Sequence, residues 1–269
     1  MGDLIKAVIM GIVEGFTEFL PVSSTGHLLI AGDLLRFGGS EGGTFEIFIQ
    51  FGAVVALLVY YVPELLAQAG CVVSGRGDAR RFWLHVFVAF LPAAVVGLLL
   101  RNFIKSVLFA SPGTIAVSLI AGGIVFVVVE RLPLRPTTHD PEKVTLGQAV
   151  AIGIAQVLSL VPGVSRSGAT IVGAMLSGVD RSAATRFSFY LAIPTLGAAT
   201  LFELATSLKN LNGGDALLLL VGTAAAAVVA FLSIGWLLRY VQRNSFVPFG
   251  VYRIAAGLVI LVLIQLGVA

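Results

Sequence analysis

The residues best suited to chemistry lie in one short stretch, Glu14 to His27, which reads EGFTEFLPVSSTGH. Glu14 and Glu18 are four residues apart. On a helix both carboxylates would therefore project from one face, with Cβ atoms about 5 to 6 Å apart. Two such groups in a low dielectric need a shared proton or a cation between them. Mg²⁺ or Ca²⁺ fits because hard cations prefer carboxylate and phosphate oxygens, although the pair alone also fits the lining of a pore.

A proline followed by hydroxyl residues comes next in this stretch. Pro21 interrupts the helix, and small or hydroxyl residues open the next one: Ser23, Ser24, Thr25 and Gly26. Exposed amides at a helix N-terminus attract phosphate, whereas Ser and Thr there are most often simple N-caps. His27 adds an imidazole, and a hydroxyl close to an imidazole and a carboxylate has the groups of an activated nucleophile. A lone histidine is more often structural, so this role depends on the neighbouring residues.

A second stretch, Pro162 to Thr170, reads PGVSRSGAT and carries one cation, Arg166, among Ser165, Ser167 and Gly168. An arginine at membrane depth costs roughly 2.5 to 3.5 kcal/mol, so it needs an anion. A phosphate held in the guanidinium fork supplies one. An ion pair with Glu14 or Glu18 is the structural alternative, and the sequence leaves both open.

The composition places both stretches in a membrane. Of 269 residues, 58% are hydrophobic and only 12% are charged, against about 25% in soluble domains. A net charge of +3 gives no nucleic-acid surface. The single cysteine, Cys71, excludes an internal disulfide framework and a cysteine zinc cluster.

Six apolar runs are long enough to cross a bilayer, at about 45–64, 83–100, 114–130, 187–206, 216–238 and 250–268. Regions 4–37 and 147–178 are apolar but broken by Pro, Gly and hydroxyl residues, which predicts two re-entrant helical hairpins. Their broken backbone must be buried in protein or line a wet cavity. We therefore expect an all-α integral membrane protein with six transmembrane helices.

The two broken regions resemble each other. An offset of 142 places Ser165 on Ser23, Arg166 on Ser24 and Gly168 on Gly26. The sequence thus predicts one membrane domain, 1–269, built from repeats of about 1–130 and 147–269. Each repeat has one hairpin, which does not cross the membrane, and three spans. Because three is an odd number of crossings, the second repeat has the opposite orientation in the membrane. In such an inverted-topology repeat the two hairpin tips can meet near the midplane.

Charge predicts the orientation. The loops on one side carry most of the basic residues: Arg76, Arg80, Arg81, Arg131, Arg135, Lys143, Arg181, Arg186, Arg239 and Arg243. That side should be cytoplasmic, which turns both termini outward. The other side has Lys6, Arg36, Arg101, Lys105 and Lys209. Arg253 is placed near the basic side, leaving Arg166 as the only cation expected at a tip.

These residues resemble a known family, the bacterial undecaprenyl pyrophosphate phosphatases of the bacitracin-resistance type. The resemblance covers nearly the whole chain, and both stretches match its signatures. It implies hydrolysis of a C55 lipid diphosphate to the monophosphate in the bacterial inner membrane, with a divalent cation and a site that opens toward the periplasm. Through that reaction it also implies recycling of the lipid carrier of cell-wall synthesis and resistance to bacitracin.

Carried over by residue, the resemblance implies Ser24 as nucleophile, Glu14 and Glu18 as metal or acid/base carboxylates, His27 as proton-transfer group and Arg166 as phosphate clamp. The remaining residues would bind substrate: Ser23, Thr25, Gly26, Ser165, Ser167 and Gly168. Glu46 and Gln50 either line the cavity or make interhelical hydrogen bonds.

Two alternatives stay open on the sequence. Water could attack the phosphorus directly, with Ser24 only a ligand. Inverted repeats and broken helices are also typical of secondary transporters, so a flippase for a lipid phosphate is the competing function. The candidate partners are the polyprenyl diphosphate, membrane lipids and a second copy of the chain in a homodimer, but no nucleic acid.

Overall fold

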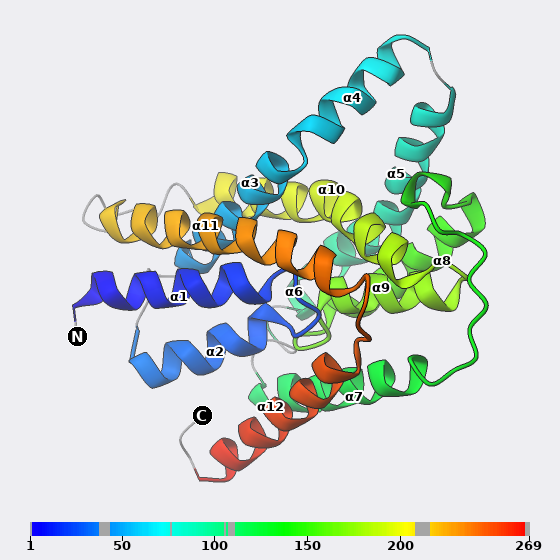
Figure 1. Cartoon of the computed structure of the whole chain (residues 1–269). Coiled ribbons are helices and arrows are strands. Elements are labelled where there is room, and N and C mark those ends of the chain that lie inside the picture. The colour runs from blue at the N-terminus through cyan, green and yellow to red at the C-terminus, as the bar shows by residue number, and fades with distance from the viewer. Residues whose placement is uncertain are drawn as a thin grey trace.

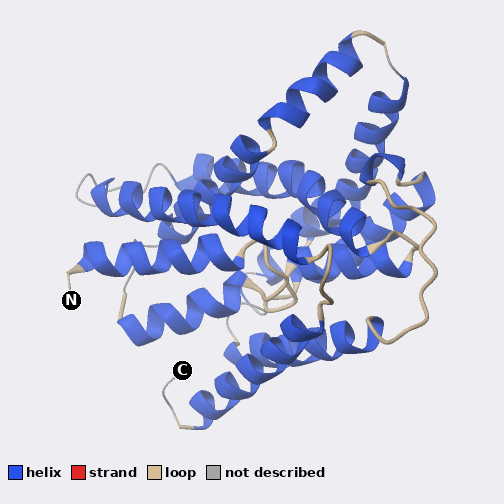
Figure 2. Cartoon of the chain, in the orientation of Figure 1, coloured by secondary structure: helices blue, strands red, loops and turns tan. Residues whose placement is uncertain are grey.

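The computed structural model describes residues 2–37, 44–75, 77–104, 106, 111–207 and 216–266. All elements named in these ranges are helices (Figure 2). In chain order they are α1 (Asp3–Thr17), α2 (Ser24–Leu35), α3 (Thr44–Tyr60), α4 (Val62–Val73), α5 (Gly77–Leu99), α6 (Arg101–Phe103), α7 (Pro112–Val129), η3 (Pro141–Lys143), α8 (Leu146–Val157), η4 (Leu158–Leu160), α9 (Arg166–Leu176), α10 (Arg181–Ser207), α11 (Ala216–Tyr240) and α12 (Val247–Gln265). The all-helical prediction is confirmed for these ranges.

Five of the described helices are long and apolar enough to cross a membrane: α5, α7, α10, α11 and α12. They agree within several residues with five of the six predicted runs. The remaining run, predicted as one span over 45–64, is different. It begins in α3 and passes into α4 through a 65° bend, so the pair counts as at most one broken span.

The bend follows from the local sequence. Pro63 stands in the first turn of α4, where its fixed φ is tolerated, but it has no N–H to donate to the carbonyl oxygen four residues earlier, so α3 cannot continue unbroken through it. Tyr61 lies between the two helices with φ −96° and ψ 6°, and its side chain is buried against Tyr190. The chain therefore turns at an aromatic contact of the core.

The two broken regions form helix pairs, α1 with α2 and α8 with α9. A non-helical tip joins the first pair, and η4 with a non-helical tip after it joins the second. Figure 1 shows the α1–α2 pair on one side of the molecule and the α8–α9 pair toward the other, with their tips between them. The same view places the beginning of α1 and the end of α12 on one side.

Small residues bring the long helices close to the hairpins. A Cβ on Gly11 of α1 would lie 2.3 Å from the carbonyl oxygen of Gly222 in α11. A Cβ on Gly153 of α8 would lie 2.8 Å from the carbonyl oxygen of Ala89 in α5. Backbones in such contact pack as membrane helices do, through small side chains and van der Waals contact.

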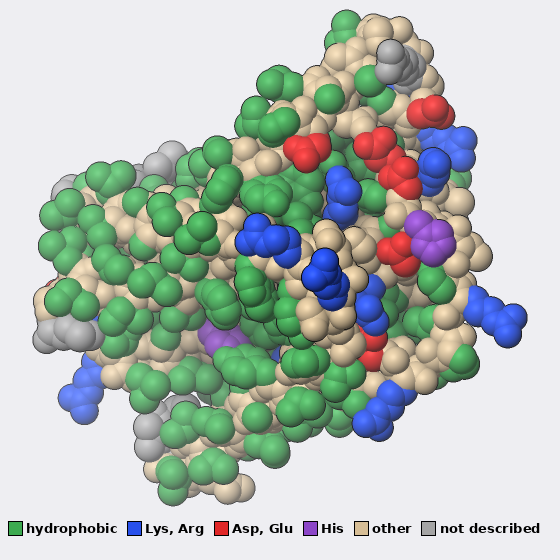
Figure 3. Space-filling view, viewed as in Figure 1, with side chains coloured by type: hydrophobic (Ala, Val, Ile, Leu, Met, Phe, Trp, Pro, Cys, Tyr) green, Lys and Arg blue, Asp and Glu red, His purple; other side chains and the backbone are tan. Residues whose placement is uncertain are grey.

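The surface separates apolar and charged side chains. Figure 3 shows hydrophobic side chains over the face that α1 and α11 present, while Lys, Arg, Asp and Glu gather toward the end with the α4–α5 and α7–α8 connections. Large apolar side chains such as Leu220, Val228 and Leu232 are more than half exposed, which suits contact with lipid. Three basic residues of the orientation argument, Arg76, Lys105 and Lys209, lie outside the described residues.

Candidate active site

The first tip begins where α1 ends. Glu18 caps α1, and the chain turns through Pro21 before Ser24 opens α2. Ser23 adopts φ 71° and ψ 97°, a left-handed conformation that costs energy for a residue with a Cβ. Glu18 and Ser24 are thereby brought to the same side of the turn, and the Ser24 hydroxyl donates a hydrogen bond of 2.6 Å to Oε2 of Glu18.

The second tip has the same local conformation. Ser165 adopts φ 72° and ψ 118°, and its hydroxyl accepts a hydrogen bond of 3.2 Å from the backbone N–H of Gly168, capping α9. Ser23 and Ser165 are the residues that the offset of 142 superposes. With Arg36 at the end of α2, they are the described non-glycine residues with positive φ.

The two tips touch each other. Nη2 of Arg166 lies 3.4 Å from Oε1 of Glu18, and the Ser167 hydroxyl donates to the carbonyl oxygen of Leu20 at 3.0 Å. The side chains of Arg166 and Glu18 are only 8% and 6% exposed. Glu18 therefore binds Ser24 with one oxygen and Arg166 with the other.

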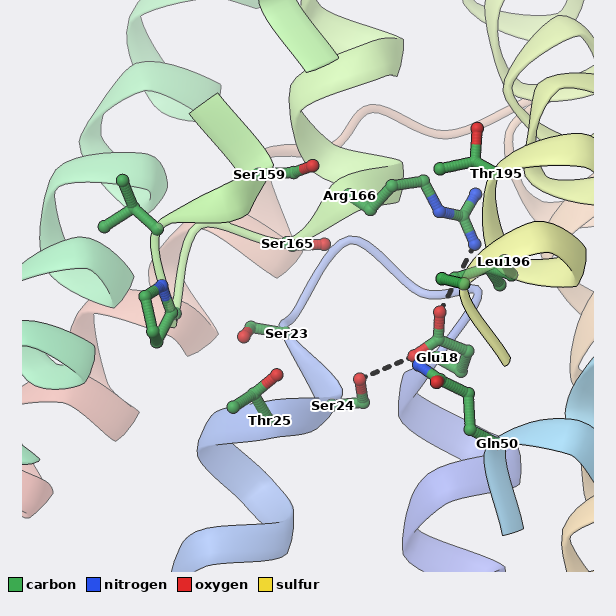
Figure 4. A pocket seen from close by; sticks show the side chains of 14 residues that line it. Glu18, Ser23, Ser24, Thr25, Gln50, Ser159, Ser165, Arg166, Thr195 and Leu196 are labelled. Atoms are coloured by element: carbon green, nitrogen blue, oxygen red, sulfur yellow. Dashed lines mark hydrogen bonds and ion pairs between the residues drawn. The ribbon is translucent and has the colours of Figure 1, made fainter. Parts of the chain in front are cut away.

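A cavity of about 180 Å³ opens between the tips (Figure 4). Six of the residues predicted for the site line it: Glu18, Ser23, Ser24, Thr25, Ser165 and Arg166. Gln50 of α3 also lines it, whereas Ser159 and Thr195 were not predicted. Ser159 and Thr195 are isolated polar residues in apolar segments, so no sequence pattern marked them as site residues.

Arg166 keeps hydrogen-bonding capacity in this arrangement. Nη1 donates weakly to the Ser188 carbonyl oxygen at 3.4 Å, and the guanidinium carbon lies 5.8 Å from the Phe19 ring centre. Nε is buried without a hydrogen-bond partner among the described residues. A planar fork with an unsatisfied N–H beside a hydroxyl-lined cavity is suited to an oxyanion such as phosphate.

Glu14 lies one helical turn behind Glu18 and is 1% exposed. Its Oε2 atom is buried without a hydrogen-bond partner, as is Oε2 of Glu46, and Glu14 interacts electrostatically with both Glu18 and Glu46. Within the described ranges no three His, Cys, Asp or Glu side chains group closely enough to hold a metal alone. The unsatisfied oxygens fit a cation that also keeps substrate phosphate oxygens in its shell, as Mg²⁺ does.

His27 is not among the residues that line the cavity. Nδ1 bonds the Ser23 carbonyl oxygen at 2.7 Å, and Nε2 bonds the Tyr252 hydroxyl at 2.6 Å, with the two rings stacked. Because a carbonyl oxygen only accepts, Nδ1 carries the proton and Nε2 accepts from Tyr252 in the neutral ring. In this conformation His27 supports the strained turn, and its predicted proton transfer to Ser24 stays a prediction.

Three other predicted site residues lie in the packing between elements. Ser167 is fully buried and bonds across the tips. A Cβ on Gly26 would lie 3.2 Å from Ile115 of α7, and one on Gly168 would lie 3.1 Å from the Arg253 guanidinium. Their smallness lets the tips approach neighbouring helices.

Arg253 shows that Arg166 is not the only cation at the tips, as the sequence had led us to expect. It lies in the second turn of α12, is fully buried and joins both tips. Nη1 donates to the Pro21 carbonyl oxygen at 3.0 Å, and Nη2 donates to Gly163 and Val164 at 3.0 and 2.9 Å. Longer bonds reach the carbonyl oxygens of Ser118 and Leu119 in α7. Carbonyl partners leave no sequence signal, so only the fold reveals this role.

The fold and the cavity define a helical membrane protein in which hydroxyl side chains and a buried arginine line a cavity between two helix pairs. The chain belongs to the family described as Bacitracin resistance protein BacA, whose sequence profile matches residues 7–259. It is 47% identical over 264 residues to the undecaprenyl-diphosphatase of Dechloromonas aromatica (strain RCB), covering 98% of this chain and 96% of that protein. It is 45% identical to the undecaprenyl-diphosphatase of Deinococcus radiodurans over 269 residues, covering 99% and 97%. The predicted family is confirmed.

Proposed function

We propose that the cavity between the two tips hydrolyses undecaprenyl diphosphate to undecaprenyl phosphate and inorganic phosphate. The observation that carries this proposal is the 2.6 Å hydrogen bond from Ser24 to Glu18, whose other oxygen meets Arg166. The Glu18 carboxylate thereby contacts both the nucleophile, Ser24, and the phosphate-binding cation, Arg166, and it is placed to act as the base. Relatives over nearly the full length are undecaprenyl-diphosphatases, which supplies the substrate class.

The reaction begins with attack of Ser24 Oγ on the terminal phosphorus. The Oγ–P bond forms while the bond from that phosphorus to the bridging oxygen breaks, so lipid monophosphate leaves. Glu18 takes the hydroxyl proton across the 2.6 Å bond and passes it to the departing phosphate. Water then attacks the phosphorus of the phosphoserine and the Oγ–P bond breaks. The water oxygen stays on inorganic phosphate, and one of its protons restores the Ser24 hydroxyl. Arg166 holds phosphate oxygens as negative charge shifts between them.

A divalent cation is part of this proposal. Glu14 and Glu46 would hold it through their unsatisfied oxygens, with Glu18 at the edge of its shell. When bound, such a cation would neutralise phosphate oxygens and so allow an anionic substrate to approach buried carboxylates. This set keeps the predicted ligands Glu14 and Glu18 and adds Glu46.

The proposed topology has six crossings and two re-entrant hairpins in an inverted repeat. Three observations support it: Ser23 and Ser165 share one conformation, the beginning of α1 and the end of α12 lie on one side, and α1 packs on α11 as α8 packs on α5. We place the basic connections in the cytoplasm and the termini outside, in the bacterial inner membrane. We also propose that the site opens toward the outer face, as the resemblance to the family implies.

Phosphate release by purified protein in detergent tests the function, because a micelle has no second compartment across which a lipid could be transported. We expect release of one inorganic phosphate per undecaprenyl diphosphate, dependent on Ser24 and on Mg²⁺ or Ca²⁺. Binding of the lipid without phosphate release, in protein that is folded and supplied with either cation, would favour the transporter instead.

A further inference from the structure

A second cavity, of about 380 Å³, lies between α5 and α10 beside the first. Its walls are almost wholly apolar, and small residues on the two helices hollow it out: Ala93, Ala94, Gly97, Ala198 and Ala199. Larger side chains at these positions would close the space. A built apolar cavity of this size is typical of a ligand site more than of a packing defect.

The two cavities are continuous at one end. Ser159, Thr195 and Ala199 line both. Figure 4 shows Ser159 and Thr195 on the Arg166 side of the first cavity, away from Ser24. The polar site thus leads into the apolar one past two hydroxyls, and the nucleophile stands at the opposite wall.

The apolar cavity extends along α10 from Thr195 to Glu203, eight residues or about 12 Å of helix. At Glu203 a 3.0 Å ion pair joins α10 to Arg101, whose guanidinium also lies 4.9 Å from the Phe202 ring centre. The cavity therefore has a polar boundary at each end and an apolar middle. Its length suits the beginning of an isoprenoid chain, with the rest lying in the surrounding lipid.

We propose that the α5–α10 cavity binds the first isoprenoid units of the polyprenyl diphosphate and so turns the terminal phosphate toward Ser24. With the prenyl group past Ser159 and Thr195, the phosphate that carries it lies near these hydroxyls. The terminal phosphate then lies between Arg166 and Ser24. The cavity thereby determines which phosphorus Ser24 attacks, an inference that rests on the proposed function.

Filling the cavity tests this assignment. Ala94→Phe on α5 and Ala198→Phe on α10 place a ring into it from opposite walls. Gly197→Phe is the matched control, because nothing lies within 4 Å of the Cβ position of Gly197 and it does not line the cavity. Each purified protein is assayed with undecaprenyl diphosphate and with isopentenyl diphosphate, which has the same headgroup and only one isoprenoid unit.

We expect both filled variants to lower the ratio of kcat/KM for the long substrate over the short one about ten-fold or more, chiefly through KM. Ten-fold is about 1.4 kcal/mol, the burial of about two methylene groups. Gly197→Phe should keep the wild-type ratio. An unchanged ratio in both filled variants, with thermal stability kept, would overturn the cavity assignment while leaving the hydrolase intact. Absence of phosphate release by the wild type would instead remove the proposed function.

Discussion

Glu18 divides its two carboxylate oxygens between Ser24 and Arg166, so three side chains from two distant stretches act as one group. If Ser24 is the nucleophile, Ser24→Ala should fold normally and lose about three orders of magnitude or more in kcat. Ser23→Ala should be much milder, because only one hydroxyl can stand in line with the leaving group. Trapping a labelled phosphoserine during turnover would identify the intermediate, whereas substantial turnover by Ser24→Ala would support direct attack by water.

Arg166 tests whether the planar fork or merely the charge matters. Arg166→Lys keeps a cation beside Glu18 but replaces the fork with a point donor. We expect kcat/KM to fall about 10² to 10³-fold with little change in melting temperature. Arg166→Ala should also melt earlier, because it leaves a buried carboxylate unpaired, a loss of about 3 to 5 kcal/mol. An active Arg166→Lys would reduce its role to charge balance.

Glu14 has a buried oxygen without a partner, and it tests the cation. Glu14→Gln keeps the shape but removes a charge, so half-maximal activity should require at least about ten-fold more Mg²⁺ or Ca²⁺. Glu18→Gln should lose turnover at every cation concentration, since it also removes the partner of Ser24. Normal hydrolysis by Glu14→Gln at limiting cation would place the ion elsewhere.

The site residues differ in how visible they are in the sequence. Glu18, Ser24 and Arg166 stand in two dense polar stretches of an apolar chain, and that contrast predicts them. Arg253 is a single cation in an apolar run, and its partners are carbonyl oxygens that every residue possesses. The Tyr252 bond to His27 joins residues 225 positions apart, so only the fold brings it about.

At the scale of elements, the helices were predictable because apolar length and Pro, Gly and hydroxyl breaks are local signals. The bend before α4 was not, because Pro63 is also tolerated in the first turn of a helix and the apolar run continues past it. Tip contacts depend on packing between the repeats. The offset of 142 nevertheless pointed to the two serines with left-handed backbone.

Arg253 tests how the helices and tips are held together, because its one guanidinium joins α12 to α7 and to both tips. Arg253→Met should lower the melting temperature markedly, since at least three buried carbonyl oxygens lose their donor at about 1 to 3 kcal/mol each. Arg253→Lys retains part of this bonding, so its stability should be intermediate while kcat still falls about ten-fold or more. Tyr252→Phe, the neighbouring control, removes only the His27 bond. If Arg253→Met kept the melting temperature and kcat of the wild type, the two tips would keep their positions without Arg253.

For the whole molecule, orientation is the property to test. Cys71 lies near the end of α4, close to the basic connection with Arg80 and Arg81, and it is the only cysteine. A thiol reagent that cannot cross membranes should therefore leave it unlabelled in intact cells and react after permeabilisation. A cysteine placed at Gly2, on the predicted outer side, is the positive control. Labelling of Cys71 from outside intact cells would invert the proposed topology.

The position of Arg253 in the chain also has a consequence for biogenesis. A ribosome makes both hairpins well before it makes α12, so the growing chain holds its tip carbonyl oxygens without their donor. A lipid diphosphate that reached such an intermediate would meet Ser24 and Arg166 before the two tips are fixed together. We therefore expect the protein to become active only when α12 inserts, so that a chain truncated before α12 would be inactive.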